Sequence, residues 1–196
     1  MEEQLKEIIK YFTARLTNLF LTKEDFCQLY GLASNVPENG RIIEIGAGAG
    51  CSMVAMAIAS KAKDRGIKLI SIDSFHDANY LKYEYGWSIT KESALAKFLE
   101  TIKFWGLDVK LLQEHSALVC KGIEDRSVDL LFIDGNHQHF EVKADIINYS
   151  PKVKDEGILC GHDYNADVHP GVVKAVDEMF NKGFQVLGSS SVWRRN

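Results

Sequence analysis

The sequence lacks several features that would assign it to particular classes of protein. Among its 196 residues only three are proline, which excludes a proline-rich linker and a largely disordered chain. No apolar stretch reaches the roughly 18 residues that a membrane-spanning helix needs. The amino terminus, MEEQLKEIIKYF, is charged and amphipathic, whereas a signal peptide begins with basic residues and continues with an apolar run. We therefore expect a cytoplasmic protein with no membrane partner.

Cysteine pairs and clustered positive charge are also missing. Cys27, Cys51, Cys120 and Cys160 are widely spaced and form no C-x-x-C pair, so neither a disulfide framework nor a zinc knuckle is indicated. The formal net charge is −4, and lysine and arginine are scattered along the chain. A nucleic-acid partner is therefore not indicated, because such partners require a basic face.

Residues 1–40 predict a helical extension made of two helices. The first has an apolar stripe at three-and-four spacing, and the second begins with a capping box formed by Thr22 and Asp25. The stripe must be covered by the chain's own sheet or by a partner subunit, so a homo-oligomer is left open. Its members are Leu5, Ile8, Ile9, Phe12, Leu16, Leu19 and Phe20.

Residues 41–196 predict a doubly wound α/β fold. The short runs RIIEI, KLISI, VKLL, VDLLFI and GILC are typical of parallel strands buried on both faces. Helical segments over about 50–64, 90–105, 138–149 and 171–182 alternate with these strands. The last segment, FQVLGSSSVWRR, has two short runs around a Gly-Ser turn, which favours an antiparallel hairpin at one sheet edge.

A glycine-rich turn, EIGAGAGCS, follows the first predicted strand at the place where α/β sheets bind ligands. Asp73 closes the second strand, and a carboxylate there can accept both hydroxyls of a ribose. The dinucleotide fingerprint has its third glycine where Cys51 stands, and Glu44 has the wrong charge for a pyrophosphate. Glu44 suits instead the cationic methionine end of S-adenosylmethionine.

Histidines and carboxylates gather after the later strands, and all six histidines follow strands two to five. Asp134 and His137 follow the fourth strand, while His162 and Asp163 follow the fifth, so adjacent strand ends should bring them together. Carboxylate oxygens and an imidazole nitrogen can hold a divalent cation. Alternatively, Asp134 contacts the cofactor or the substrate, and His162 and Asp163 form a structural hydrogen bond. Surface positions or helix caps are the alternatives for His76, His139 and His169.

Because of the glycine turn, Glu44 and Asp73, residues 41–196 resemble the class I S-adenosylmethionine-dependent methyltransferases. The resemblance implies a seven-stranded Rossmann-like sheet with a terminal antiparallel hairpin. The turn is similar to that of catechol O-methyltransferase-like enzymes, which implies that Ser52 helps to hold the methionine carboxylate and that His115 lies beside the adenine. The cofactor-binding residues implied in this way are Glu44, Gly46, Ala47, Gly48, Ser52, Asp73, Ser74, His115 and Ser116.

The residues after strands four and five resemble those of metal-dependent sugar and antibiotic O-methyltransferases, such as the macrocin and mycinamicin enzymes, and of the cephalosporin-hydroxylase-like group. The resemblance implies that Asp134, His162 and Asp163 bind a divalent metal. It also implies that His137 is the catalytic base. His162 stands where those enzymes mostly have Asp or Glu, so it indicates either an ion softer than magnesium, such as manganese, iron or zinc, or a residue that supports the ligands.

The sequence thus predicts an S-adenosylmethionine-dependent O-methyltransferase that acts on a small molecule. Residues 74–88 are rich in aromatic side chains and predict a substrate lid, or else packing against the following helix. A nicotinamide-dependent oxidoreductase is one alternative, but it leaves Glu44 and the histidine-rich cluster unexplained. A non-catalytic S-adenosylmethionine-binding protein leaves His137 unexplained. A nucleic-acid methyltransferase would show a basic face or an N-P-P-Y-like motif, and neither is visible.

Overall fold

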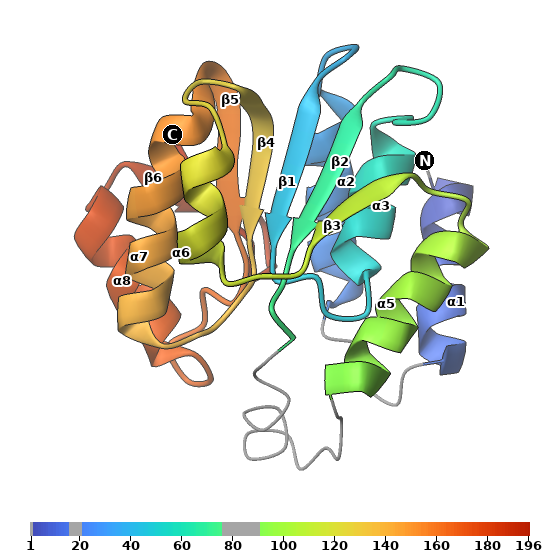
Figure 1. Ribbon diagram of the computed structural model, residues 1–196. Coiled ribbons are helices and arrows are strands. Elements are labelled where there is room, and N and C mark those ends of the chain that lie inside the picture. Colours follow the sequence, from blue (N-terminus) through green and yellow to red (C-terminus); the bar gives the residue numbers. More distant parts are fainter. Residues whose placement is uncertain (1, 16–20, 76–90) are drawn as a thin grey trace.

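A seven-stranded sheet forms the centre of the molecule in a computed structural model that describes residues 2–15, 21–75 and 91–196 (Figure 1). The strand order is β3-β2-β1-β4-β5-β7-β6, and the first five strands in this order are parallel. β7 pairs antiparallel with both β5 and β6, which confirms the predicted terminal hairpin. The strands are β1 (Arg41–Ile45), β2 (Lys68–Ile72), β3 (Val109–Leu112), β4 (Val128–Ile133), β5 (Val153–Gly161), β6 (Phe184–Val186) and β7 (Trp193–Arg195).

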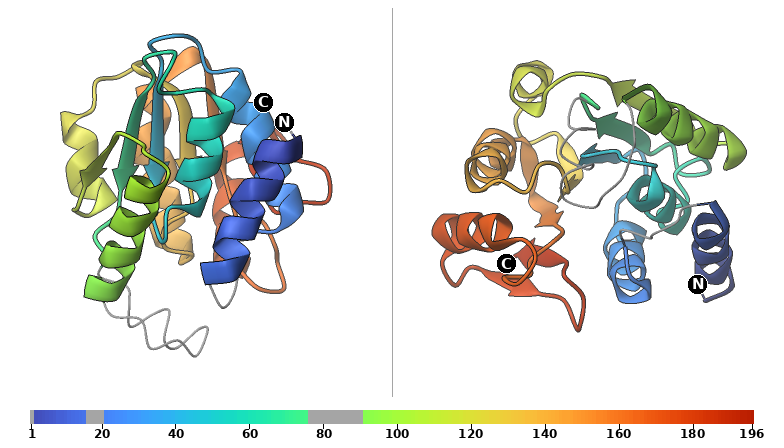
Figure 2. Two further views of the ribbon diagram at one scale, coloured as in Figure 1. Left: turned by 90° about the vertical axis from the view of Figure 1, so that its right-hand side faces the viewer. Right: turned by 90° about the horizontal axis from the view of Figure 1, so that it is seen from below.

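Helices cover both faces of this sheet (Figure 2). On one face lie α2, α3 and α5, with α1 packed outside α3, and on the other lie α6, α7 and α8. The helices are α1 (Glu2–Arg15), α2 (Lys23–Ser34), α3 (Cys51–Ala59), α5 (Lys91–Phe104), α6 (Ser116–Val119), α7 (His139–Tyr149) and α8 (Pro170–Phe180). None of these described helices has the length and apolar composition of a membrane-spanning segment.

The central strands are apolar at every position because they are buried on both faces. In β4 all six residues are buried. Phe132 packs in the cluster that includes α2 and α3, whereas its neighbours Leu131 and Ile133 pack in the cluster that includes α7 and α8. Successive side chains of a strand point to opposite faces, so only a continuous apolar run satisfies both layers.

The two amino-terminal helices pack against the chain's own core. Leu5, Ile8 and Phe12 of α1 are buried in the same cluster as Phe26 of α2. The capping box of α2 is present, since Thr22 and Asp25 exchange hydrogen bonds between side chain and backbone. Part of the predicted stripe, Leu16, Leu19 and Phe20, lies outside the described residues.

Two predicted boundaries are wrong. The helix predicted over 50–64 ends at Ala59, because Lys61 adopts a left-handed backbone (φ 52°) that an α-helix does not continue. β5 begins at Val153 rather than at Gly157, because Val153 pairs with Val128 ahead of a register shift in the β4–β5 ladder. Both errors lie away from the carboxyl ends of the strands.

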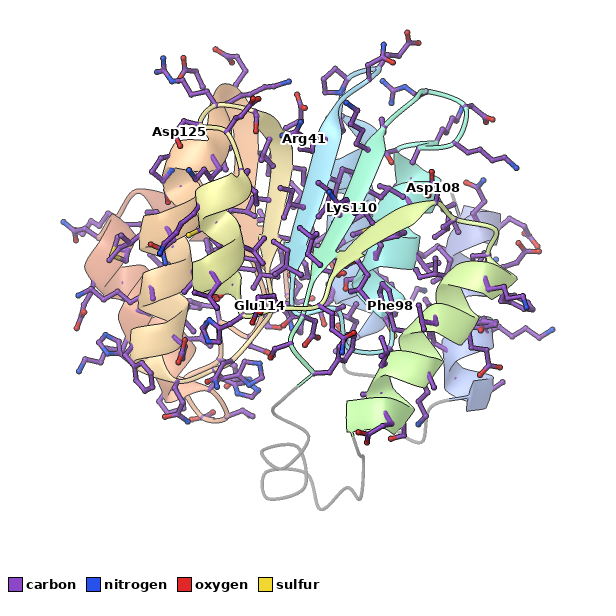
Figure 3. All side chains as sticks on the ribbon, viewed as in Figure 1. Arg41, Phe98, Asp108, Lys110, Glu114 and Asp125 are labelled. Carbon is purple, nitrogen blue, oxygen red and sulfur yellow. The ribbon has the colours of Figure 1, made fainter. Side chains whose placement is uncertain are left out.

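Polar groups at the amino ends of the strands pair with one another, at the edge opposite to the glycine turn (Figure 3). Arg41 lies at the amino end of β1, where its backbone amide donates to Asp129 Oδ2 at 2.8 Å. Lys154 Nζ donates to both oxygens of the same carboxylate, at 2.8 and 2.9 Å. Glu114 lies at the opposite, lower edge, onto which the glycine turn also opens.

Candidate functional site

The glycine turn after β1 is pressed against the loop after β4. Gly46 has a φ of +91°, and a Cβ placed on it would lie 1.9 Å from the carbonyl oxygen of Asp134. The amide of Asp134 in turn donates to the carbonyl oxygen of Ile45 at 2.8 Å. Only glycine fits this close approach, so the turn and the predicted catalytic loop form one continuous edge.

Asp73, at the end of β2, ties the turn to the second strand. Its Oδ2 accepts the backbone amides of Ala47 at 2.9 Å and Gly48 at 3.1 Å, and its Oδ1 accepts the amide of Phe75 at 2.7 Å. Ser74 follows and is half-buried. The carboxylate predicted to hold the ribose therefore already organises the backbone that would surround the cofactor.

Glu44 lies beneath the turn and is fully buried. The hydroxyls of Ser52 and Ser71 donate to its two carboxylate oxygens. Burial raises the pKa of Glu44 to about 8. Ser52 is itself buried in the first turn of α3, so the structure places both predicted methionine-end residues together under the turn rather than on its open side.

His115 and Ser116 lie at the start of α6, beside α7. His115 is the N-cap residue, and its Nδ1 accepts the amide of Ala117 at 3.3 Å. The hydroxyl of Ser116 donates to Asp145 at 2.5 Å, a carboxyl group whose pKa burial raises to about 6. The end of β3 is held to β2 by the amide of Asp73, which donates to Leu112, so the predicted adenine-side residues share the edge with the glycine turn.

His162 lies at the centre of the predicted metal site. Its Nδ1 is 3.1 Å from Asp163 Oδ1 and 3.6 Å from Asp134 Oδ1. Its Nε2 is 2.9 Å from the hydroxyl of Ser191 and 3.3 Å from Asp25 Oδ2. The structure therefore brings together the three predicted ligands, and it adds one residue from α2 and one from the segment between β6 and β7.

Three carboxylates control the charge of this cluster. Burial alone would lower the pKa of His162, but the negative charge of Asp134 and hydrogen bonds to Asp163 and Asp25 hold it well above 6.5. Burial alone would raise the pKa of Asp25, but the contact with His162 and hydrogen bonds from Thr22 bring it to about 2. The carboxylates therefore favour the protonated form of the buried imidazole of His162.

His137 lies on the other side of Asp163. Its Nε2 is 2.9 Å from Asp163 Oδ2, while Nε2 of His169 is 3.5 Å from Asp163 Oδ1. The two imidazole rings meet edge to face, with centroids 4.1 Å apart. A small cavity lined by Asp134, His137 and His162 adjoins them. The predicted base therefore shares a carboxylate with the predicted metal ligands.

Two sets of potential metal donors exist among the described residues, and they share Asp163. One is the predicted set of Asp134, His162 and Asp163, and the other consists of His137, Asp163 and His169. In each set the donor atoms lie within 4.8 Å of one another. Two carboxylates and one imidazole nitrogen form a mixed oxygen and nitrogen set that fits manganese or a softer divalent ion better than magnesium.

Three residues of this cluster were not among the predicted site residues. Asp25 was predicted only as a capping residue, yet one carboxylate caps α2 and also contacts His162. Ser191 had no sequence signal, because its position depends on how the hairpin folds back. His169 is the N-cap residue of α8, in agreement with its predicted alternative as a helix cap, but its contact with Asp163 was not predicted.

The predicted lid can be traced only at its beginning. Phe75 is buried, packs against Phe98 and has a φ of 52°. The other aromatic residues of the predicted segment, Tyr80, Tyr83, Tyr85 and Trp87, lie outside the described residues.

The chain has the Rossmann-like fold of a class I S-adenosylmethionine-dependent methyltransferase. The strand order, the glycine turn and the carboxylate at the end of β2 identify this class. The chain belongs to the family described as "Methyltransferase domain", whose model matches residues 43–164. The match begins within β1 and ends just after β5, so it includes the glycine turn, Asp73 and the strand-end residues Asp134, His162 and Asp163.

Known proteins share this region or this fold. An uncharacterised protein of Sinorhizobium fredii is 30% identical over 129 residues, which are 66% of this chain. The match spans only 14% of the length of that relative. The S-adenosylhomocysteine-bound methyltransferase PaMTH1 of Podospora anserina superposes with a TM-score of 0.67 at 18% identity, over 97% of this chain and 86% of that one.

A third similar protein is the TDP-rhamnose 3′-O-methyltransferase of calicheamicin biosynthesis. It superposes with a TM-score of 0.59 at 14% identity, over 100% of this chain and 93% of that one. At such low identity, both solved structures are evidence for the fold.

Proposed function

We propose that this protein transfers a methyl group from S-adenosylmethionine to a hydroxyl group of a small molecule. The observation that carries the proposal is the position of His137 and Asp163, 2.9 Å apart, on the same edge as the glycine turn and Asp73. Methyl transfer to a hydroxyl requires a proton acceptor on the same edge as the turn that binds the cofactor. The name of the calicheamicin relative, an O-methyltransferase that acts on a sugar nucleotide, supports the choice of acceptor class.

For this reaction the protein must position the acceptor hydroxyl next to the methyl group and remove one proton. Asp163 contacts Nε2 of His137 at 2.9 Å and orients the imidazole ring, which would accept the proton of the acceptor hydroxyl. The oxygen then attacks the methyl carbon in line with the carbon–sulfur bond, and S-adenosylhomocysteine leaves. Because the sulfonium loses its positive charge, a site that excludes water and holds the three atoms collinear favours the transition state.

A divalent metal is part of the same proposal. Asp134, His162 and Asp163 would hold it, and when bound it would lower the pKa of the acceptor hydroxyl. Asp25 would then support the set, because a ligating histidine commonly donates its second ring N–H to a carboxylate.

Calorimetry of the whole chain tests the cofactor. S-adenosylmethionine and S-adenosylhomocysteine should bind, and NAD should not. Binding of NAD alone would favour the nicotinamide-dependent alternative and contradict the proposal.

Transfer of labelled methyl groups to a panel of hydroxylated small molecules tests the reaction. His137→Ala should reduce the rate by roughly 10² to 10⁴ while cofactor affinity is kept. His139→Ala is the matched control, because that ring pairs with Glu178 at the surface, at 2.9 Å. Tight cofactor binding without transfer to any acceptor would favour the non-catalytic alternative.

A further inference from the structure

Two imidazole rings converge on one carboxylate within the proposed catalytic site. Nε2 of His137 lies 2.9 Å from one oxygen of Asp163, and Nε2 of His169 lies 3.5 Å from the other. All three donors lie within 4.8 Å of one another. The segment 163–169 returns to the sheet edge through two tight contacts, in which amides donate from Asn165 to Asp163 and from His169 to Asn165, both at 2.7 Å.

The two distances between an imidazole and Asp163 are close to the spacing of ligands around a tetrahedral ion, and all three donor residues lie within 4.8 Å. Bonds of about 2.0–2.1 Å from zinc to histidine nitrogen or carboxylate oxygen place neighbouring donors roughly 3.3 Å apart. The two observed separations lie on either side of that value, so small movements of the side chains would admit an ion. We infer that His137, Asp163 and His169 form a binding site for a borderline divalent transition-metal ion such as Zn²⁺.

The fold holds the three donors in place through their backbones. A Cβ on Gly171 would lie 2.3 Å from the carbonyl oxygen of His137, so the start of α8 is packed directly on the loop after β4. This contact brings His169, two residues earlier, beside His137. Asp163 has a left-handed backbone with a φ of 61°, a conformation that aspartate adopts more readily than most residues other than glycine.

The three donors differ in exposure. The side chain of His169 is 6% exposed, whereas those of His137 and Asp163 are 15% and 17% exposed. An ion that reaches the cluster past His137 and Asp163 would keep one position for water or for an oxygen of a ligand, as catalytic zinc sites with three protein ligands do. His162 Nδ1, 3.1 Å from Asp163 Oδ1, would support the ligating carboxylate.

This site differs in chemistry from the set formed by Asp134, His162 and Asp163. It offers two imidazoles rather than one, which favours zinc, cobalt or nickel over magnesium. An ion bound here uses Nε2 of His137 and the carboxylate that orients it. Metal binding by His137 and proton removal by His137 are therefore alternative uses of the same residues. The inference goes beyond the proposed methyl transfer and does not depend on it.

Zinc titration of the chelator-treated whole chain, in competition with a coloured chelator, tests the inference. The wild type should bind Zn²⁺, and His169→Ala should weaken that binding at least about tenfold, because it removes a ligand that only this set uses. His139→Ala should keep the wild-type affinity. Millimolar Mg²⁺ should not compete.

X-ray absorption of Zn²⁺ on the wild type makes the test independent of any variant. Two imidazoles around the ion support the site, and one imidazole places the ion on the predicted set and overturns the inference. An unchanged zinc affinity in His169→Ala would also overturn it. Calorimetry with S-adenosylmethionine on the same sample reports separately on the proposed function, since neither result requires the other.

Discussion

Asp25 Oδ2 lies 3.3 Å from Nε2 of His162, which joins a helix near the amino terminus to the end of the fifth strand. The other oxygen of Asp25 accepts the amide of Ser191 at 3.0 Å. One buried carboxylate therefore connects α2, β5 and the terminal hairpin, three segments far apart in the sequence. Its position makes it both a helix cap and a partner of the candidate site.

Asp25→Asn should destabilise the fold by roughly 3–5 kcal/mol near neutral pH, because it leaves His162 without one partner of a buried ion pair. The pKa of Asp25 falls on folding, so its contribution to the free energy of unfolding is present above pH 3.8 and is lost as the pH falls towards about 2. The pKa of His162 rises on folding, so its contribution to the same free energy is present below pH 6.5 and is lost as the pH rises well above that value. The difference between wild type and variant, measured by urea unfolding, should therefore be largest between about pH 4 and 6.5.

The control for this experiment is Asp155→Asn. Asp155 pairs with Arg126 at 2.7 Å, but the two side chains are 69% and 71% exposed. Its loss should cost less than about 1 kcal/mol. Equal effects of the two substitutions would show that the contact between Asp25 and His162 is not a buried ion pair.

Glu44→Gln should change the pH dependence of stability. The pKa of Glu44 rises from 4.5 to about 8 on folding, so its favourable contribution is full below pH 4.5 and is lost as the pH rises through about 8. Over that range the wild type should lose up to about 1.4 kcal/mol per pH unit from this group. The variant should lack this slope in urea unfolding at pH 5, 6.5 and 8, whereas Glu114→Gln, at an exposed position, should retain it.

Gly46→Ala should be far more damaging than Gly48→Ala. Both glycines have positive φ values, of 91° and 48°, but only at Gly46 does a Cβ meet backbone, 1.9 Å from the carbonyl oxygen of Asp134. Gly48→Ala should cost on the order of 1 kcal/mol from its backbone alone. Gly46→Ala must also separate the turn from the Asp134 loop, so denaturant unfolding should show a loss several times larger. Similar losses would mean that the two loops are not in contact.

Asp73→Asn should weaken S-adenosylmethionine binding by roughly 1.5–3 kcal/mol, because a charged acceptor for the ribose hydroxyls becomes neutral. The amide oxygen can still accept the backbone amides of Ala47 and Gly48, whereas the NH2 group cannot accept the amide of Phe75, so the glycine turn should keep its two contacts and lose only the one to Phe75. Calorimetry measures the change, and Asp108→Asn at the exposed start of β3 is the control. A dissociation constant equal to that of the wild type would remove Asp73 from the cofactor site.

Much of the fold could be predicted because its signals are local. The run VDLLFI is apolar at every position, so it indicates a strand buried on both faces, and the structure buries all six residues. Thr22 and Asp25 indicate a helix start because the capping box lies within four residues. The doubly wound rule then places the ends of β4 and β5 side by side, and this brings Asp134, His162 and Asp163 together.

The rest of the site depends on contacts that no local pattern encodes. Ser191 reaches His162 only because the hairpin folds back antiparallel to β5. His169 reaches Asp163 only because α8 packs on the loop after β4 at Gly171. The burial of Ser52 against Glu44 depends likewise on how tightly α3 closes over β1.

The contacts of Asp25 with His162 and Ser191 also limit how far this protein can be truncated for experiments. The family model recognises residues 43–164, yet Asp25 precedes that range, and Ser191 and the fully buried Trp193 follow it. A fragment trimmed to the recognised range would lose two partners of His162 and would expose the core residues that the first two helices cover. A fragment that keeps these contacts must therefore be longer at both ends than the range that the family model matches.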